Sequence, residues 1–167
     1  MDRVMLFVLK KRGRKRSCTR AKGDCVMTVG LVIVSHSAQL AEGVAELAGQ
    51  MAQGKVAIAI AGGTSDGALG TSVEKIVDAL NLADGPDGIL VLLDLGSAVM
   101  TTEMAVEAFA KDQQHCVVIS PAPLVEGAVI AAVEASIGNS LQEVAEAAAS
   151  ATTLPKVHDR KGEEKDY

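Results

Sequence analysis

The hydrophobic residues after position 29 follow two alternating patterns. Short apolar runs rich in Val, Ile and Leu occupy residues 30–36, 56–61, 89–95 and 115–120. Such runs are typical of strands that are buried on both faces. Between the runs, apolar residues recur every three or four positions, which predicts amphipathic helices. These helices are expected at residues 38–52, 71–80, 97–110, 124–137 and 141–148.

Two of the predicted helices carry a capping signal at the residue where each is expected to begin. Thr71 with Glu74, and Ser140 with Glu143, match the Ser/Thr-x-x-Glu capping box. In that motif the hydroxyl and the carboxylate satisfy backbone N–H groups that the first turn leaves without partners. Thr71 and Ser140 are therefore expected to cap their helices.

The alternation of strands and helices predicts the fold class. Strands without polar alternation require a sheet that is covered on both faces. We therefore expect an α/β fold, with a doubly wound, mainly parallel four-stranded sheet and helices on both faces. Ligands bind such sheets beyond the carboxyl ends of the strands, where the strand order reverses. Polar residues that follow the strands are thus the candidates for chemistry.

Charge divides the 167 residues into three parts. Residues 1–27 hold nine basic and two acidic residues, residues 28–150 form the predicted domain, and residues 151–167 are a polar tail. We expect the first part to be disordered or an over-long start, because Met27 directly precedes the first predicted strand. A basic arm and a targeting signal are the alternatives. The tail is also expected to be disordered.

Composition argues against several classes of protein. Only 2% of the residues are aromatic, and residues 28–167 hold nineteen acidic but seven basic residues, so nucleic-acid binding is not expected. No apolar run approaches the roughly 18 residues of a membrane span. Cys18, Cys25 and Cys116 lack metal-ligand spacing, so no metal site is expected, and Cys116 is expected to be a buried thiol. The cysteine usage favours a cytoplasmic protein.

His36 follows the first predicted strand and is the candidate reactive residue. A neutral imidazole is nucleophilic, and at a strand end its ring can reach solvent while its backbone is fixed. Asp94, near the end of the third predicted strand, could accept a hydrogen bond from one ring nitrogen and so fix the tautomer. Structural interpretations stand beside these: His36 could be a satisfied hydrogen-bonding residue, and Asp94 could cap the next helix.

Two glycine-rich turns follow the second and third predicted strands, and their donors suit an anion such as phosphate. The residues expected to support a phosphate are Ser37, Gly63, Thr64, Ser65, Gly96 and Ser97. The glycines also suit tight turns without any ligand. Ser35 and Ser37 flank His36 and are not expected to share a triad with it. No lysine lies near this edge by sequence, and His115 is expected to be structural at the opposite edge.

Four segments carry a resemblance to a known family. They are residues 31–37 (Leu-Val-Ile-Val-Ser-His-Ser), 61–67 (Ala-Gly-Gly-Thr-Ser-Asp-Gly), 94–98 (Asp-Leu-Gly-Ser-Ala) and 122–128 (Ala-Pro-Leu-Val-Glu-Gly-Ala). In this order and at these intervals they resemble the DhaM family. That family provides the phosphotransferase subunit of the phosphoenolpyruvate-dependent dihydroxyacetone kinase, and its domain is similar to the mannose-type enzyme IIA of the sugar phosphotransferase system. The resemblance covers about residues 29–149 and implies the mannose-type enzyme IIA fold.

The resemblance also implies a function. The histidine that matches His36 would accept a phosphoryl group from the phosphocarrier HPr, as a transient phosphohistidine on the ring nitrogen remote from the backbone. The phosphate would pass to ADP held by DhaL, and then to dihydroxyacetone on DhaK, so this chain would bind no cofactor directly. A homodimer is implied as well. Thr101 departs from the Asn expected in many relatives.

Two other functions stay open from the residues alone. A mannose-type enzyme IIA would pass its phosphate to a sugar transporter domain instead of to ADP on DhaL. A regulatory module would bind another protein according to its phosphorylation state, and would pass no phosphate on.

Overall fold

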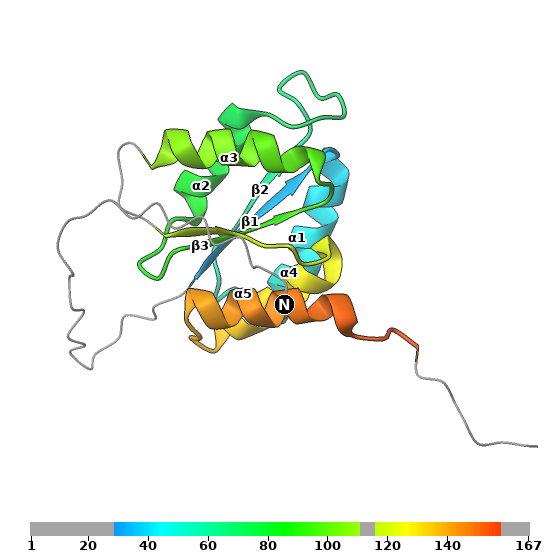
Figure 1. Ribbon diagram of the computed structural model, residues 1–167, viewed down its shortest axis with the longest axis vertical. Helices are drawn as coiled ribbons and strands as arrows, with labels where there is room; N and C mark the ends of the chain where they lie inside the picture. The colour runs from blue at the N-terminus through cyan, green and yellow to red at the C-terminus, as the bar shows by residue number, and fades with distance from the viewer. Residues whose placement is uncertain (1–28, 111–115, 158–167) are drawn as a thin grey trace, which may run out of the picture.

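The computed structural model describes residues 29–110 and 116–157, and Figure 1 shows how their elements are arranged. The strands in these ranges are β1 (Gly30–Ser35), β2 (Ile58–Gly62), β3 (Ile89–Leu93) and β4 (Val117–Ile119). The helices there are α1 (Ala38–Ala52), α2 (Val73–Ala83), α3 (Ser97–Phe109), α4 (Leu124–Ser136) and α5 (Leu141–Ser150), followed by the 3-10 turn η1 (Ala151–Thr153). Strands and helices alternate in the predicted order up to β4 and α4, so the predicted α/β class is confirmed.

The strands form one sheet in the order β2-β1-β3-β4, and all neighbouring pairs are parallel. The chain runs from β1 to β2 at one edge and then crosses back to β3, so the strand order reverses between β1 and β3. In this pair Val34 lies opposite Leu93. The residues that follow the two strands therefore meet at one edge of the sheet, which is where doubly wound sheets bind ligands.

Helices cover both faces of the sheet, as predicted. In Figure 1, α2 and α3 lie above the sheet, while α4 and α5 lie below it. Leu31 and Ile33 of β1 pack into the layer of α1, α4 and α5, whereas Val32 and Val34 pack into the layer of α2 and α3. Successive side chains of a strand point to opposite faces, so a continuous apolar run supplies both layers.

The caps of two helices test the capping boxes predicted from sequence. Ser140 and Glu143 form the predicted capping box of α5. At α2 the cap is Ser72, whose hydroxyl accepts the backbone N–H of Lys75, so the prediction that Thr71 caps this helix is wrong. Both neighbours carry a hydroxyl, and the chain enters the helix one residue later than predicted. The hydroxyl of Thr71 is consequently free to bond elsewhere.

Cys116 is exposed, so the prediction of a buried thiol is wrong. The residue stands one position before β4, and burial in this apolar run begins only at Val117. The sequence run therefore extends beyond the stretch that the sheet covers.

Some predictions lie outside the described residues. They are those for His115 and for residues 1–27, while the tail at 151–167 is described only to residue 157. Within residues 29–110 and 116–157, no helix is both long enough and apolar enough to cross a membrane.

Candidate active site

His36 and Asp94 stand at the edge where the strand order reverses. His36 directly follows β1, and Asp94 directly follows β3, the neighbouring strand. Although 58 positions separate them in the chain, their side chains are in hydrogen-bonding contact. Two largely buried strands thus fix both backbones, and the contact depends on the fold more than on any local motif.

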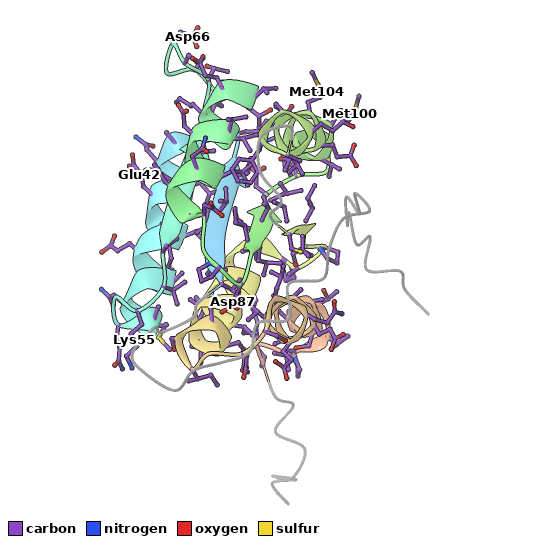
Figure 2. The ribbon with its side chains drawn as sticks, turned by 90° about the vertical axis from the view of Figure 1, so that its left-hand side faces the viewer. Glu42, Lys55, Asp66, Asp87, Met100 and Met104 are labelled. Carbon is purple, nitrogen blue, oxygen red and sulfur yellow. The ribbon has the colours of Figure 1, made fainter. Side chains whose placement is uncertain are left out.

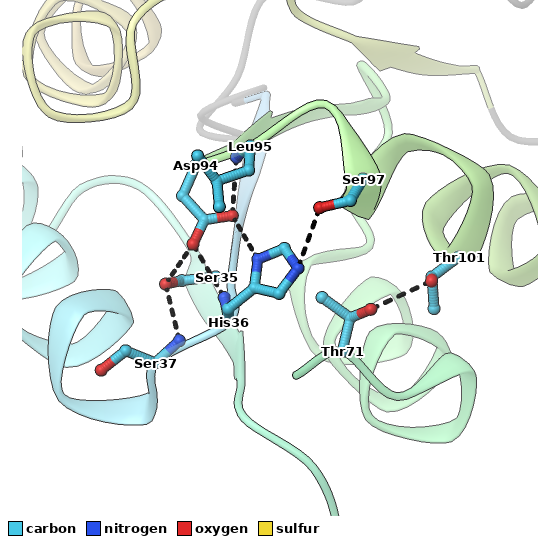
Figure 3. A network of polar contacts seen from close by, with 8 residues as sticks. All are labelled: Ser35, His36, Ser37, Thr71, Asp94, Leu95, Ser97 and Thr101. Carbon is cyan, nitrogen blue, oxygen red and sulfur yellow. Dashed lines mark hydrogen bonds and ion pairs between the residues drawn. The ribbon is translucent and has the colours of Figure 1, made fainter. Parts of the chain in front are cut away.

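The Asp94 carboxylate accepts hydrogen bonds from four groups (Figure 3). Its Oδ2 accepts the backbone N–H of His36 at 2.8 Å and the hydroxyl of Ser35 at 2.9 Å. Its Oδ1 accepts the ring Nδ1–H of His36 at 3.0 Å and the backbone N–H of Leu95 at 2.7 Å. Both oxygens are therefore fixed in position, and the carboxylate plane is set relative to the ring.

This environment determines the charge of Asp94. Burial acts to raise the pKa of Asp94, but the hydrogen bonds from the His36 backbone, the His36 ring and the Ser35 hydroxyl outweigh it. The pKa of Asp94 consequently lies below its ordinary value of 3.8, and the group is ionised at neutral pH. Because a carboxylate can only accept, Nδ1 of His36 must carry the proton of that bond.

That tautomer leaves Nε2 of His36 with its lone pair. The hydroxyl of Ser97 donates to Nε2 at 3.1 Å, and Figure 3 shows the ring between Asp94 on one side and Ser97 on the other. The His36 side chain is 27% exposed, whereas that of Asp94 is 9% exposed. A reacting molecule can thus reach the ring while the carboxylate stays shielded, so the site presents a nucleophilic nitrogen to solvent.

Ser35 belongs to this network, although sequence reasoning set it apart from the site. It is fully buried, and its hydroxyl donates to Asp94 and accepts the backbone N–H of Ser37 at 3.0 Å. Ser37 caps α1, because its own hydroxyl accepts the backbone N–H of Leu40 at 3.3 Å. The two serines therefore connect Asp94 to the first turn of α1.

Gly96 and Ser97 form the start of α3. Gly96 is the cap residue, and no side chain accepts a hydrogen bond there. Asp94 consequently does not cap this helix, which removes the alternative interpretation of that residue. Ser97 is the first helical residue, so its hydroxyl reaches the ring from a helix N-terminus, where neighbouring N–H groups favour negative charge.

The glycine-rich loop after β2 supports the backbone of the site. The N–H of Gly63 donates to the carbonyl of Ser35 at 3.0 Å, and the N–H of Gly70 donates to the carbonyl of His36 at 2.9 Å. Gly63 has a φ of 66°, a conformation that favours glycine. These two bonds anchor both ends of the loop to the strand end that carries His36.

The hydroxyls predicted in this loop are not at the ring. That of Thr64 lies within hydrogen-bonding distance of the Asp66 carboxylate and of the Ala68 carbonyl. Ser65 is exposed beside Asp66, which Figure 2 shows at the outer tip of the loop. The structure therefore brings His36, Asp94 and Ser97 together, and leaves Thr64 and Ser65 within their own loop.

The sequence marks Thr101 only as a departure from Asn and Thr71 only as a helix cap, so it does not predict that the two hydroxyls pair near the ring. Thr71 donates to the hydroxyl of Thr101 at 3.0 Å, and Figure 3 shows both residues on the Nε2 side of His36. Thr101 follows Ser97 by four positions, and residues with this spacing share one face of a helix. That spacing is the sequence signal that could have placed Thr101 at the site.

Lys75 also lies at this edge of the sheet, so the prediction that no lysine does is wrong. Its Nζ donates to the carbonyl of Gly62, the last residue of β2, at 3.0 Å. Within residues 29–110 and 116–157, no lysine or arginine side chain bonds to His36, Asp94 or Ser97. In the same ranges, no group of three or more His, Cys, Asp or Glu side chains could hold a metal ion.

Comparison with known proteins gives consistent matches. The family described as PTS system fructose IIA component, EIIA-man, matches residues 30–145. The phosphoryl donor subunit DhaM of a phosphoenolpyruvate-dependent dihydroxyacetone kinase in Escherichia coli is 42% identical over 119 residues. That alignment covers 70% of this chain but 25% of the relative, so the chain spans about a quarter of its length.

Other relatives match over nearly their whole length. DhaM of dihydroxyacetone kinase 2 in Listeria innocua is 35% identical, and the alignment covers 70% of this chain and 93% of that protein. The solved structure of a protein of unknown function, EF1359, is 38% identical with a TM-score of 0.63, and the match covers 74% of this chain and 95% of that one. The chain therefore belongs to the EIIA-man family of PTS system IIA components, and to the DhaM branch within it.

Proposed function

We propose that this protein is a phosphohistidine carrier of the dihydroxyacetone kinase system, with His36 as the phosphoryl-accepting nucleophile. The observation that carries the proposal is the 3.0 Å contact of His36 Nδ1 with the Asp94 carboxylate, which favours a proton on Nδ1 and leaves Nε2 on the opposite side of the ring. The names of the DhaM relatives, phosphoryl donor subunits of this kinase, support the same function.

The first step is transfer from a phosphorylated donor protein, which we propose to be HPr. The Nε2 lone pair of His36 attacks phosphorus, the donor's nitrogen–phosphorus bond breaks, and its electron pair stays on the donor's ring. The product is a phosphoramidate on Nε2, while Nδ1 keeps its proton. Asp94 then balances the positive charge of the imidazolium, in the role of the acid in a catalytic triad.

The second step reverses the first on a different acceptor. A terminal phosphate oxygen of ADP, held by the partner DhaL, attacks phosphorus, and the nitrogen–phosphorus electrons return to Nε2. The ATP so formed would phosphorylate dihydroxyacetone on DhaK. Phosphoryl transfer passes through a loose transition state, so the site needs chiefly to position the group and balance its charge.

The absence of a cation from the described contacts of the ring suits a carrier. Neutral hydroxyl donors bind a phosphoryl group less tightly than lysine or arginine would. The carrier can therefore release the group to the next protein, and partner proteins would supply the cationic groups. The described residues hold fourteen carboxylates and three lysines, which favours partners with basic contact faces.

The remaining parts of the proposal follow from this relay. In this relay the nucleotide is held by DhaL, so the chain would bind no cofactor directly and would carry the phosphoryl group as a transient phosphohistidine. A homodimer is expected by resemblance to the DhaM family, and a cytoplasmic location is expected from the cysteine usage.

The test uses phosphoenolpyruvate labelled with ³²P, enzyme I and HPr. We expect the full chain to take up label and to pass it to ADP-loaded DhaL with DhaK, yielding labelled dihydroxyacetone phosphate. The His36→Ala variant should fold, because the ring is partly exposed at the edge of the sheet, and it should take up no label. Full labelling of that variant would overturn the assignment.

A second candidate is an enzyme IIA that feeds sugar uptake. The description of the matching family, a fructose IIA component, favours it. In the same experiment, transfer to a transporter IIB domain without transfer to ADP-loaded DhaL would establish this function. Labelled protein that binds a partner but passes label to neither acceptor would indicate the regulatory module.

A further inference from the structure

We propose that Thr71 binds the phosphoryl group: while the group is on Nε2 of His36, the Thr71 hydroxyl donates a hydrogen bond to one of its oxygens, and Thr101 positions that hydroxyl. The proposal rests on the proposed function, because it concerns the phosphorylated form of the same site. It assigns a role to two residues that lie outside the His36–Asp94 contact.

The backbone next to Thr71 is bonded to His36. The preceding residue, Gly70, donates its N–H to the carbonyl of His36 at 2.9 Å. The loop is therefore fixed to the reactive residue within one position of Thr71. Figure 3 shows Thr71 between the ring and Thr101, on the side of Nε2.

The second argument is that the Thr71 hydroxyl has no capping role. Ser72 caps α2, so the Thr71 hydroxyl bonds across to α3 instead, where it donates to Thr101 at 3.0 Å. Thr101 stands one helical turn after Ser97, whose hydroxyl is 3.1 Å from Nε2. Two elements thus place residues with hydroxyls on the same side of the ring.

The phosphoryl group needs more donors than Ser97 provides. A phosphoryl group on Nε2 carries three oxygens, and Ser97 alone can serve only one of them. A hydroxyl has one donor and two acceptor positions, and its hydrogen rotates. When the phosphoryl group arrives, the Thr71 hydrogen can turn to an oxygen while the Thr101 hydroxyl donates to Thr71. The pair thereby exchanges donor and acceptor roles.

The test compares variants of nearly equal volume in the full chain. Thr71→Val removes the hydroxyl, and we expect phosphorylation of His36 by HPr to slow by roughly ten- to a hundredfold, in line with the loss of one transition-state donor. The phosphohistidine should also hydrolyse faster. Thr71→Ser should restore both properties, and Thr71→Ala provides a second deletion if the valine variant folds poorly.

Thr102→Val is the matched control on α3. Thr102 is fully buried, and within the described residues its hydroxyl has no hydrogen-bond partner. This variant should fold and transfer phosphate at the wild-type rate. Thr101→Val should slow transfer less than Thr71→Val, and the double variant should show less than the summed effect because the two residues act as a pair.

The outcomes separate this inference from the proposed function. If wild-type protein takes up no label on His36, the proposed function fails. If wild-type protein is labelled on His36 and Thr71→Val matches its rate and its hydrolysis, the role of Thr71 fails. Loss of thermal stability in Thr71→Val with unchanged transfer would show that the pair only clamps the loop to α3, and would also overturn the proposal.

Discussion

The two nitrogens of the His36 ring have opposite surroundings. On the Nδ1 side, an ionised and shielded carboxylate accepts four hydrogen bonds and is fixed by residues of two core strands and the turns after them. On the Nε2 side, the described hydrogen bond is to the neutral hydroxyl of Ser97 on α3, and the bonded hydroxyls of Thr71 and Thr101 lie on the same side. The Nδ1 side holds the ring in place, and under the proposed function the Nε2 side receives the phosphoryl group and releases it.

The difference suits the proposed function, in which one histidine both accepts and donates phosphate. Orientation requires a strong, permanent contact, which the charge-assisted bond to Asp94 provides. Transfer requires contacts that do not trap the product, which hydroxyls without a neighbouring cation provide. The two requirements are met on different sides of one ring.

Asp94→Asn should slow phosphoryl transfer more than any other variant, because it changes the Nδ1 side of the ring. The amide cannot accept all four donors or balance the imidazolium, and the wrong tautomer becomes accessible. We expect the initial rate of His36 phosphorylation to fall by roughly 10²- to 10⁴-fold, as for the acid of a catalytic triad. A rate within twofold of wild type would reduce Asp94 to a structural residue.

Ser97→Ala changes the open side and should have a smaller effect. It removes one neutral donor from Nε2 and from the phosphoryl group, and we expect transfer to slow by about tenfold. Single-turnover kinetics with phosphorylated HPr measures this directly. Ser150→Ala is the control, because the hydroxyl of Ser150 donates to the carbonyl of Ala147 within α5, far along the chain from the ring. If Ser97→Ala slowed transfer more than Asp94→Asn, the Nε2 side of the ring would matter more than the Nδ1 side, which would contradict the comparison.

Ser35→Ala tests the support behind the carboxylate. The variant leaves the Ser37 N–H and one Asp94 oxygen without this buried partner. We expect the free energy of unfolding to fall by about 1–3 kcal/mol, while transfer slows less than in Asp94→Asn. Urea unfolding followed by circular dichroism measures the change, and an unchanged midpoint would show that the hydroxyl contributes little.

The lowered pKa of Asp94 should also make the stability of the folded protein depend on pH. The folded-state pKa of Asp94 lies below 3.8, so its stabilisation is fully present above that pH and is lost as pH falls through the folded-state value. The stability difference between wild type and Asp94→Asn should therefore shrink in urea unfolding as the pH is lowered below about 3.8. A constant difference across this range would contradict the lowered pKa.

Thr64→Val should have the smallest effect on transfer. Its hydroxyl contacts Asp66 and Ala68 within the glycine-rich loop, away from the described contacts of the ring. We expect transfer within twofold of wild type and a small loss of thermal stability. A large loss of transfer would show that the Thr64 hydroxyl does belong to the phosphate site on the Nε2 side of the ring.

The sequence predicted the fold and the contact of His36 with Asp94 for physical reasons. Unbroken apolar runs require a sheet covered on both faces, and in such a sheet the ends of neighbouring parallel strands meet. His36 and Asp94 were therefore placed together from the pattern alone, and the structure confirms their contact at 3.0 Å. The contact of Ser97 with Nε2 likewise agrees with the predicted convergence of the strand ends.

The rest of the site depends on side-chain directions that a linear pattern does not contain. Thr71 and Ser72 are equally plausible caps in the sequence, and only the entry of the chain into α2 decides between them. In the sequence Lys75 is 13 positions from Gly62, and its contact with the end of β2 depends on how α2 packs. Ser35 belongs to the apolar strand, so nothing in the sequence marks its hydroxyl as a partner of Asp94.

The central claim is that His36 carries phosphate on the nitrogen remote from Asp94. Loading the protein with phosphate from phosphoenolpyruvate, enzyme I and HPr, followed by adduct mapping and ¹⁵N and ³¹P NMR, tests it directly. We expect one acid-labile adduct, on Nε2 of His36, with Nδ1 still protonated toward Asp94. An adduct on Nδ1 or on any other residue, or no adduct, would contradict the account.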